Sequence, residues 1–151
     1  MNGCGGKGRS SKRVSVKLRT RASEFTRLVG RAEKFAKLAG LPIAERSRLL
    51  ILLEELFLNV INHGSGGEVL SRQIEIILSL TGGELMIDFS DDGQPFDPLS
   101  AAPPDLDQPL ENRKVGGLGL RILRSLADDA RYTRDGGRNR LILIRIIEGL
   151  E

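Results

Sequence analysis

Hydrophobic and polar residues follow two different periods along this chain, and these periods predict its elements. Residues 14–20 alternate apolar and polar side chains, which is typical of a half-buried strand. Residues 23–39 carry apolar residues three and four apart, which predicts a helix with one apolar stripe and Ser23 as its N-cap. A longer apolar helix is predicted over residues 44–63.

The second half of the chain is predicted to form two hairpins with a helix between them. Strands are expected at residues 73–80, 84–90, 130–134 and 139–147, and a helix at residues 118–127. Paired glycines at 82–83 and 136–137 indicate the turns. Strand pairs separated by helices favour an α/β two-layer sandwich, in which helices cover one face of a mixed, mainly antiparallel sheet.

Length and composition indicate a single soluble domain. The chain has 151 residues and one cysteine, Cys4, so no disulfide framework is possible and a reducing compartment fits. No apolar stretch approaches the ~20 residues of a membrane span. The first residues also lack the apolar middle of a signal peptide. We therefore expect a cytoplasmic protein without a membrane partner.

The positive charge is concentrated at the start of the chain. Residues 1–21 contain seven Lys or Arg and no acid, so the overall charge of +3 leaves −4 for the other 130 residues. Residues 1–13 are predicted to be a flexible basic arm before a domain of residues 14–151. The arm could bind DNA or be a solvated tail. One Tyr and no Trp favour the tail and no direct nucleic-acid binding.

Polar residues interrupt the long apolar helix in its last turns, EELFLNVINHG. Glu55, Asn59 and His63 lie four residues apart and, with Asn62, occupy an arc of roughly 100° on the helix. Burying a carboxylate or amide without a partner costs several kcal/mol, on the order of 2–7. The strip is therefore either a solvent-exposed face or a set of ligand-binding groups.

A glycine-rich turn, GGLGL at residues 116–120, leads directly into a predicted helix. Its free N–H groups and the helix dipole suit a phosphate, although such a turn can also be purely structural. The Asn59 oxygen could then bind Mg²⁺ beside the phosphates. Glu55, one turn earlier, could orient or deprotonate the group that attacks a terminal phosphate.

A second candidate contact follows the strand at residues 84–90. Asp91 could accept a hydrogen bond from an exocyclic amino group such as that of adenine, and Gly93 would leave room for a flat ring. The alternative is an ordinary Asp-Asp-Gly turn. Residues 97–115 contain four prolines and little periodicity, so they are predicted to be a long loop that is either a lid or disordered.

These three segments, in this order, resemble the motifs of the histidine-kinase-like (GHKL) ATPase superfamily. EELFLNVINHG resembles the N-box, DDGQPFDP the first glycine box and GGLGL the second, and the resemblance covers residues 14–147. DDGQPFDP followed by GGLGL, and the ending YTRDGGRNRLILIRI, are similar to the anti-sigma factor serine/threonine kinases. Pro95 departs from the glycine that many members of the superfamily have there.

The resemblance implies an ATP-binding sandwich with roles for individual residues. Glu55 would be the general base, Asn59 the Mg²⁺ ligand and Asp91 the adenine reader, under a lid formed by residues 97–115. The expected ATP-binding residues are Asn59, Asn62, His63, Asp91, Gly93, Gly117, Leu118, Gly119 and Leu120. Arg113 or Lys114 could reach the γ-phosphate or be a solvated pair. His63 could support Asn59 or a phosphate, or cap the helix.

The implied activity is transfer of the γ-phosphoryl group of ATP to a serine or threonine of an anti-sigma factor antagonist. The other implied partner is a sigma factor, sequestered until the antagonist displaces it, and such proteins are usually homodimers. The alternative is a non-catalytic, nucleotide-dependent partner-switching module of the same fold. Glu55 favours the kinase, although the adjacent Glu54 shows that acids occur here incidentally. A sensor histidine kinase is not expected, because the sole histidine, His63, lies in the site helix.

Overall fold

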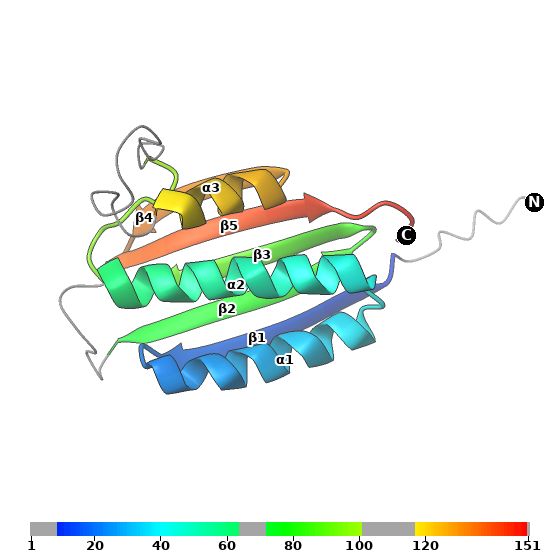
Figure 1. Cartoon of the computed structure of the whole chain (residues 1–151), viewed down its shortest axis with the longest axis horizontal. Coiled ribbons are helices and arrows are strands. Elements are labelled where there is room, and N and C mark those ends of the chain that lie inside the picture. Colours follow the sequence, from blue (N-terminus) through cyan, green and yellow to red (C-terminus); the bar gives the residue numbers. More distant parts are fainter. Residues whose placement is uncertain (1–8, 64–71, 101–116, 151) are drawn as a thin grey trace, which may run out of the picture.

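The described residues fold as a two-layer sandwich of one sheet and three α-helices (Figure 1). The computed structural model describes residues 9–63, 72–100 and 117–150, with only the backbone at His63 and at residues 117–120. Its elements are β1 (Ser11–Arg19), the 3₁₀ turn η1 (Ala22–Glu24), α1 (Phe25–Leu38), α2 (Ile43–His63), β2 (Gln73–Thr81), β3 (Glu84–Asp91), α3 (Gly117–Leu126), β4 (Asp129–Asp135) and β5 (Arg138–Ile146).

The sheet has the strand order β1-β2-β3-β5-β4, and every neighbouring pair in it is antiparallel. We expected a mixed sheet, since a helical connection often joins parallel neighbours. Here β3 and β4 do run in the same direction, but β5 folds back between them and pairs with both. The predicted sandwich is therefore confirmed, with antiparallel pairing throughout the described strands.

Two boundaries near the N-terminus differ from the expectation. β1 begins at Ser11 rather than at residue 14, so residues 11–13 belong to the sheet and not to the arm, whose residues 1–8 lie outside the described part. Ser23 was wrongly predicted as an N-cap. It lies inside η1, where the backbone N–H of Glu24 donates to the Arg21 carbonyl, and α1 starts without a side-chain cap.

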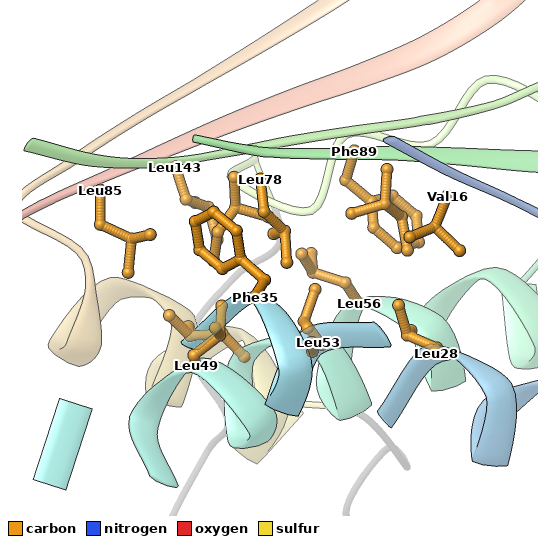
Figure 2. Packing of buried hydrophobic residues seen from close by; sticks show 14 of the residues in the cluster. Val16, Leu28, Phe35, Leu49, Leu53, Leu56, Leu78, Leu85, Phe89 and Leu143 are labelled. Atoms are coloured by element: carbon orange, nitrogen blue, oxygen red, sulfur yellow. The ribbon is translucent and has the colours of Figure 1, made fainter. Parts of the chain in front are cut away.

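The hydrophobic core lies between the sheet and the helix layer (Figure 2). Val16, Leu78 and Phe89 point from the strands toward the helix layer, where Figure 2 labels Leu28, Leu53 and Leu56. The core positions expected on the long helix are only partly confirmed: Leu49, Leu53, Leu56 and Phe57 are buried, whereas Val60 and Ile61 are half-buried. Among the described helices, none is both long and apolar enough to cross a bilayer.

Both ends of the described chain lie beside the β2–β3 turn. Ser11 pairs with Thr81, the last residue of β2. The Ile147 N–H donates to the Gly83 carbonyl at 2.8 Å, and a Cβ placed on Gly83 would lie 2.4 Å from the Leu150 oxygen. Asp91 is at the other end of β3, so the chain ends and the end of β3 are on opposite sides of the molecule (Figure 1).

Candidate functional site

A pocket opens where the C-terminal half of α2 faces the end of β3 and the start of β5. It is lined by Leu56, Asn59, Val60, Phe89, Asp91, Gln94, Phe96, Pro98, Tyr132, Asn139 and Leu141. Mostly apolar walls with a few polar groups are typical of small-molecule sites. Two residues predicted from separate motifs, Asn59 and Asp91, therefore lie in the same pocket.

Asp91 is the principal acceptor in this pocket. It is 8% exposed, and its Oδ1 accepts hydrogen bonds from the Gly93 N–H at 2.9 Å and from Asn139 Nδ2 at 3.2 Å. Among the described residues no donor is assigned to Oδ2. Burial raises the pKa of Asp91, and these two donors only partly oppose the rise. The carboxylate is thus held by one oxygen and has the other available for a ligand.

Gly93 makes this arrangement possible. A Cβ at residue 93 would lie 2.7 Å from Asp91 Oδ1, closer than such atoms approach in proteins. Any side chain there would displace the carboxylate. The backbone carbonyl of Gly93 in turn accepts a hydrogen bond from Arg134 Nη1 at 2.7 Å. The glycine therefore lets the chain after β3 fold tightly around Asp91.

Asn139, at the start of β5, was not predicted as a site residue. Its Nδ2 donates to Asp91 Oδ1 and to the Gln94 carbonyl at 2.7 Å. Its Oδ1 accepts from the Tyr132 hydroxyl at 2.6 Å and from the Phe96 N–H at 3.2 Å. One buried amide thus joins β3, the loop after it and β4, and fixes the polar end of the pocket.

Asn59 contributes a polar group that protein atoms leave unsatisfied. It is 7% exposed and its Nδ2 has no hydrogen-bond partner within the described part of the chain. Leaving a buried donor unpaired costs about 1–3 kcal/mol. A ligand that accepts this hydrogen bond would remove that cost. The amide therefore has the character of a ligand-binding side chain.

Glu55 lies one turn before Asn59 on α2 and is half-buried, but it does not line the pocket. Burial is the main cause of its raised pKa, and the neighbouring charge of Glu54 adds to the rise. A carboxylate with a raised pKa is a stronger base once it is ionised. Asn62 is exposed, and the side chain of His63 lies outside the described residues.

The glycine-rich segment begins α3. Gly117 is the first residue of this helix, and α3 contacts α2 on the side away from α1. In Figure 1 the first turn of α3 lies toward the end of the sheet that holds Asp91. The backbone of residues 117–120 thus presents the free N–H groups of a helix start. The side chains of Leu118 and Leu120 lie outside the described part.

The predicted lid is described only at its beginning. Of its residues, Pro98 lines the pocket, and Arg124 of α3 donates to the Leu99 carbonyl. Residues 101–116, which include Arg113, Lys114 and Gly116, lie outside the described part. The beginning of the lid segment therefore connects the pocket with α3.

A sheet covered on one face by helices, with a pocket between the central helix and the strand ends, defines a kinase-like ATPase fold. The chain belongs to the histidine kinase-like ATPase domain family, which it matches over residues 12–145. Domains of this family bind ATP. The family resemblance inferred from the three sequence motifs is thereby confirmed.

Known proteins similar to this chain include a protein kinase and a solved structure. Serine/threonine-protein kinase BtrW of Bordetella bronchiseptica is 30% identical over 99 residues, which cover 65% of this chain and 68% of BtrW. The RsbU and RsbW domains of Rv1364c from Mycobacterium tuberculosis match with a TM-score of 0.65 and 15% identity. That match covers 89% of this chain but 32% of the longer one, so this second similarity shows the fold alone.

Proposed function

We propose that the protein is an ATP-dependent protein serine/threonine kinase that phosphorylates an anti-sigma factor antagonist. The observation that carries the proposal is the pocket itself. It combines a buried acceptor, Asp91, with an unsatisfied amide, Asn59, and a carboxylate of raised pKa, Glu55, lies one helical turn away. The similarity to a protein named as a serine/threonine kinase supports the same class of reaction.

The pocket suits a nucleotide in one orientation. The flat base would lie between the apolar side chains of α2 and those of β3 and β5, with its exocyclic amino group donating to Asp91. The phosphates would then extend past Asn59 toward the first turn of α3, where Gly117, Leu118, Gly119 and Leu120 offer backbone N–H groups. Asn62 and His63, at the end of α2, would stand at the same side of the ligand.

The side chain of Asn59 also fits the Mg²⁺ ion that such domains usually require. The described residues contain no group of three His, Cys, Asp or Glu side chains able to hold a metal alone. Mg²⁺ commonly takes only one or two protein ligands and completes its shell with water and phosphate oxygens. Asn59 Oδ1 would be that ligand, and the ion would neutralise charge on the phosphates.

Glu55 would act as the general base. As the oxygen of a substrate serine or threonine bonds to the γ-phosphorus, its proton passes to the Glu55 carboxylate. The bond between the γ-phosphorus and the bridging oxygen breaks, and ADP leaves with the electron pair. The burial that raises the pKa of Glu55 increases its affinity for that proton.

We further propose that the protein sequesters a sigma factor in the cytoplasm until the antagonist displaces it, and that it works as a homodimer without direct contact to nucleic acid or membrane. The support for these partners is the resemblance of the DDGQPFDP and GGLGL motifs to anti-sigma factor kinases. For the dimer, the sheet face opposite the helices carries Ile77, Met86, Ile142 and Ile146, of which Ile146 is 54% exposed, around the ion pair of Asp88 and Arg140.

The decisive experiment incubates the protein with γ-labelled ATP, Mg²⁺ and candidate antagonist proteins from the same genome. We expect label on a serine or threonine of one candidate, and no label when Mg²⁺ is chelated. Tight ATP binding without transfer to any candidate would replace the kinase by the partner-switching module. If the protein did not bind ATP at all, the proposal that this pocket is a nucleotide site would be wrong.

A further inference from the structure

α2 exposes several large apolar side chains on the side that faces away from the sheet. Ile43, Ile51 and Leu58 are 80%, 42% and 41% exposed, among polar residues such as Ser47 and Glu54, although the opposite side of the same helix is buried in the core. Because α2 is the central helix of its layer (Figure 1), its outer face is available for another protein element.

A groove runs beside this face, between α1 and α2. It encloses about 570 Å³, with Ala32, Ala36 and Leu49 in its floor and Ile43 and Leu50 along its α2 side. Its walls are therefore mainly apolar. None of these residues lines the nucleotide pocket, so the groove is a separate surface.

Gly30 keeps the groove open. It lies in the interior of α1, where glycine weakens a helix relative to alanine. A Cβ added there would meet no atom within 4 Å, and the φ of Gly30 is not positive. Neither conformation nor crowding in the described residues therefore requires glycine. What its missing side chain provides is space in the groove.

The groove has a cationic rim. Lys34, Lys37 and Arg46 line it together with a single acid, Glu33. Arg46 Nε donates to the Leu41 carbonyl, whereas neither lysine forms an ion pair within the described part of the chain. An apolar floor bordered by unpaired cations is complementary to a ligand that is apolar on one side and acidic beside it.

We propose that the α1–α2 groove binds an acidic amphipathic helix of a partner protein. The apolar side chains of that helix would fill the space beside Gly30 and Leu50, and its carboxylates would meet Lys34 and Lys37. This mode of recognition places apolar anchors of one helix into a groove between two others. The inference is independent of the phosphotransfer proposed above, because it uses other residues.

A display library of helix-forming peptides of about 15 residues tests the proposal. Leucines are fixed at helical spacings of three and four, and the remaining positions vary among Glu, Lys, Gln and Ala. Selection on the full-length protein should enrich peptides with a glutamate-rich flank. Equal enrichment of lysine-rich and glutamate-rich peptides, or displacement of the bound peptides by a DNA duplex, would overturn the proposal.

Variants of the protein then locate the binding site. Gly30→Leu should weaken binding of the selected peptides at least about tenfold, and Lys34→Glu with Lys37→Glu should do the same. Gly30→Ala controls for helix propensity and should change affinity by less than about threefold, since it fills little of the groove. Lys12→Glu with Arg13→Glu makes an equal charge change at exposed positions of β1 and should have no effect.

Two further measurements separate the possible failures. Gly30→Leu and Gly30→Ala should unfold at or above the wild-type Tm, and every variant should bind a fluorescent ATP analogue as the wild type does. If the peptides bound the Gly30→Leu variant with the same affinity as the wild type, the proposal that they occupy the α1–α2 groove would be wrong. If the wild-type protein bound the peptides but not ATP, the proposed kinase function would be wrong, and the proposal of a peptide-binding groove would still hold.

Discussion

Glu45 and Asp91 are both 8% exposed, yet they lie at opposite ends of the sandwich in contrasting surroundings. Glu45, in the first turn of α2, accepts hydrogen bonds from Arg145 Nε at 2.5 Å and Nη2 at 3.0 Å, and from Arg48. Arg145 is the main cause of its lowered pKa. Asp91 accepts hydrogen bonds only from neutral donors among the described residues, and burial raises its pKa.

The contrast separates an end of the molecule stabilised by ion pairs from the end that holds the proposed nucleotide site. Arg145 also donates to the Leu126 carbonyl, so the charged cluster joins the start of α2 to β5 and to the end of α3. At the other end, burial raises the pKa of both Asp91 and Glu55, the distant charge of Arg134 opposes this only weakly at Asp91, and Asn59 Nδ2 has no acceptor among the described residues. Glu45 is thus neutralised by arginines, whereas Asp91 forms no ion pair among the described residues. Such a difference is expected where a bound ligand supplies the missing partner.

The largest effect is expected for Glu55→Gln. Loss of the general base should slow phosphoryl transfer about 10³-fold and leave the Kd for ATP nearly unchanged. The Tm should not fall, because the substitution removes a carboxylate whose charged form is penalised by burial. Single-turnover transfer, nucleotide titration and thermal unfolding check this. Transfer within tenfold of wild type would show that Glu55 is not the base.

Arg145→Ala should affect stability instead of nucleotide binding. Removing the main partner of a buried acid costs about 3 kcal/mol, and the Kd for ATP should remain as in the wild type. Arg131→Ala is the control: its side chain is 71% exposed and pairs with Asp129, so its loss should cost about 0–1 kcal/mol. Denaturant unfolding measures both. Equal losses in the two variants would contradict the structural role of the Glu45 cluster.

The same pair predicts a dependence of stability on pH. Because the folded-state pKa of Glu45 is lowered from 4.5, its contribution is present above pH 4.5 and is lost as the pH falls through the lowered value. Arg145→Ala should lack that part of the acid sensitivity. Unfolding free energies measured across this range would reveal it, and parallel curves for the two proteins would argue against it.

Asp91→Asn should weaken ATP binding about 10–100-fold, the range expected for losing a hydrogen bond to a charged acceptor. Inosine triphosphate, which has a carbonyl in place of the amino group, should bind wild type more weakly than ATP does. The variant should lose that preference. Its Tm should be equal or higher, since burial disfavours the Asp91 charge. A lower Tm with unchanged ATP affinity would show that Asp91, like Glu45, serves stability and not nucleotide binding.

The smallest effect is expected for Glu54→Gln. Glu54 is exposed and adds only the second cause of the raised pKa of Glu55. Removing its charge should lower that pKa and move the acidic limb of the transfer rate a few tenths of a pH unit downward. The rate at neutral pH should hardly change. A pH–rate profile resolves the shift, and a shift toward higher pH would be inconsistent with repulsion between the two acids.

Periodicity was sufficient to predict the elements and the layer arrangement. The alternation in β1, β2 and β3 and the three–four spacing in α1 and α2 report burial directly, so these elements were identified within a few residues. Element starts were less predictable. Ser23 was a reasonable cap by residue type, but the tight backbone turn after Arg21 already satisfies the start of α1.

The site could be predicted only where its residues form local motifs. Glu55 and Asn59 stand out against an apolar helix, and Asp91 and Gly93 form a recognisable turn. Asn139 gave one weak signal, as a polar residue opening an apolar strand. Its importance comes from its pairing opposite Asp91 in β5, a contact across 48 positions that no local pattern reveals.

The location of the chain ends has a practical consequence for experiments. Ser11 and Leu150 both lie beside the Gly82–Gly83 turn, at the far end of the sheet from Asp91. A fluorophore, an affinity handle or a surface anchor attached at residue 11 or residue 150 would thus be held at the opposite end of the sheet from the pocket. The protein can be immobilised through either position with the mouth of the pocket unobstructed.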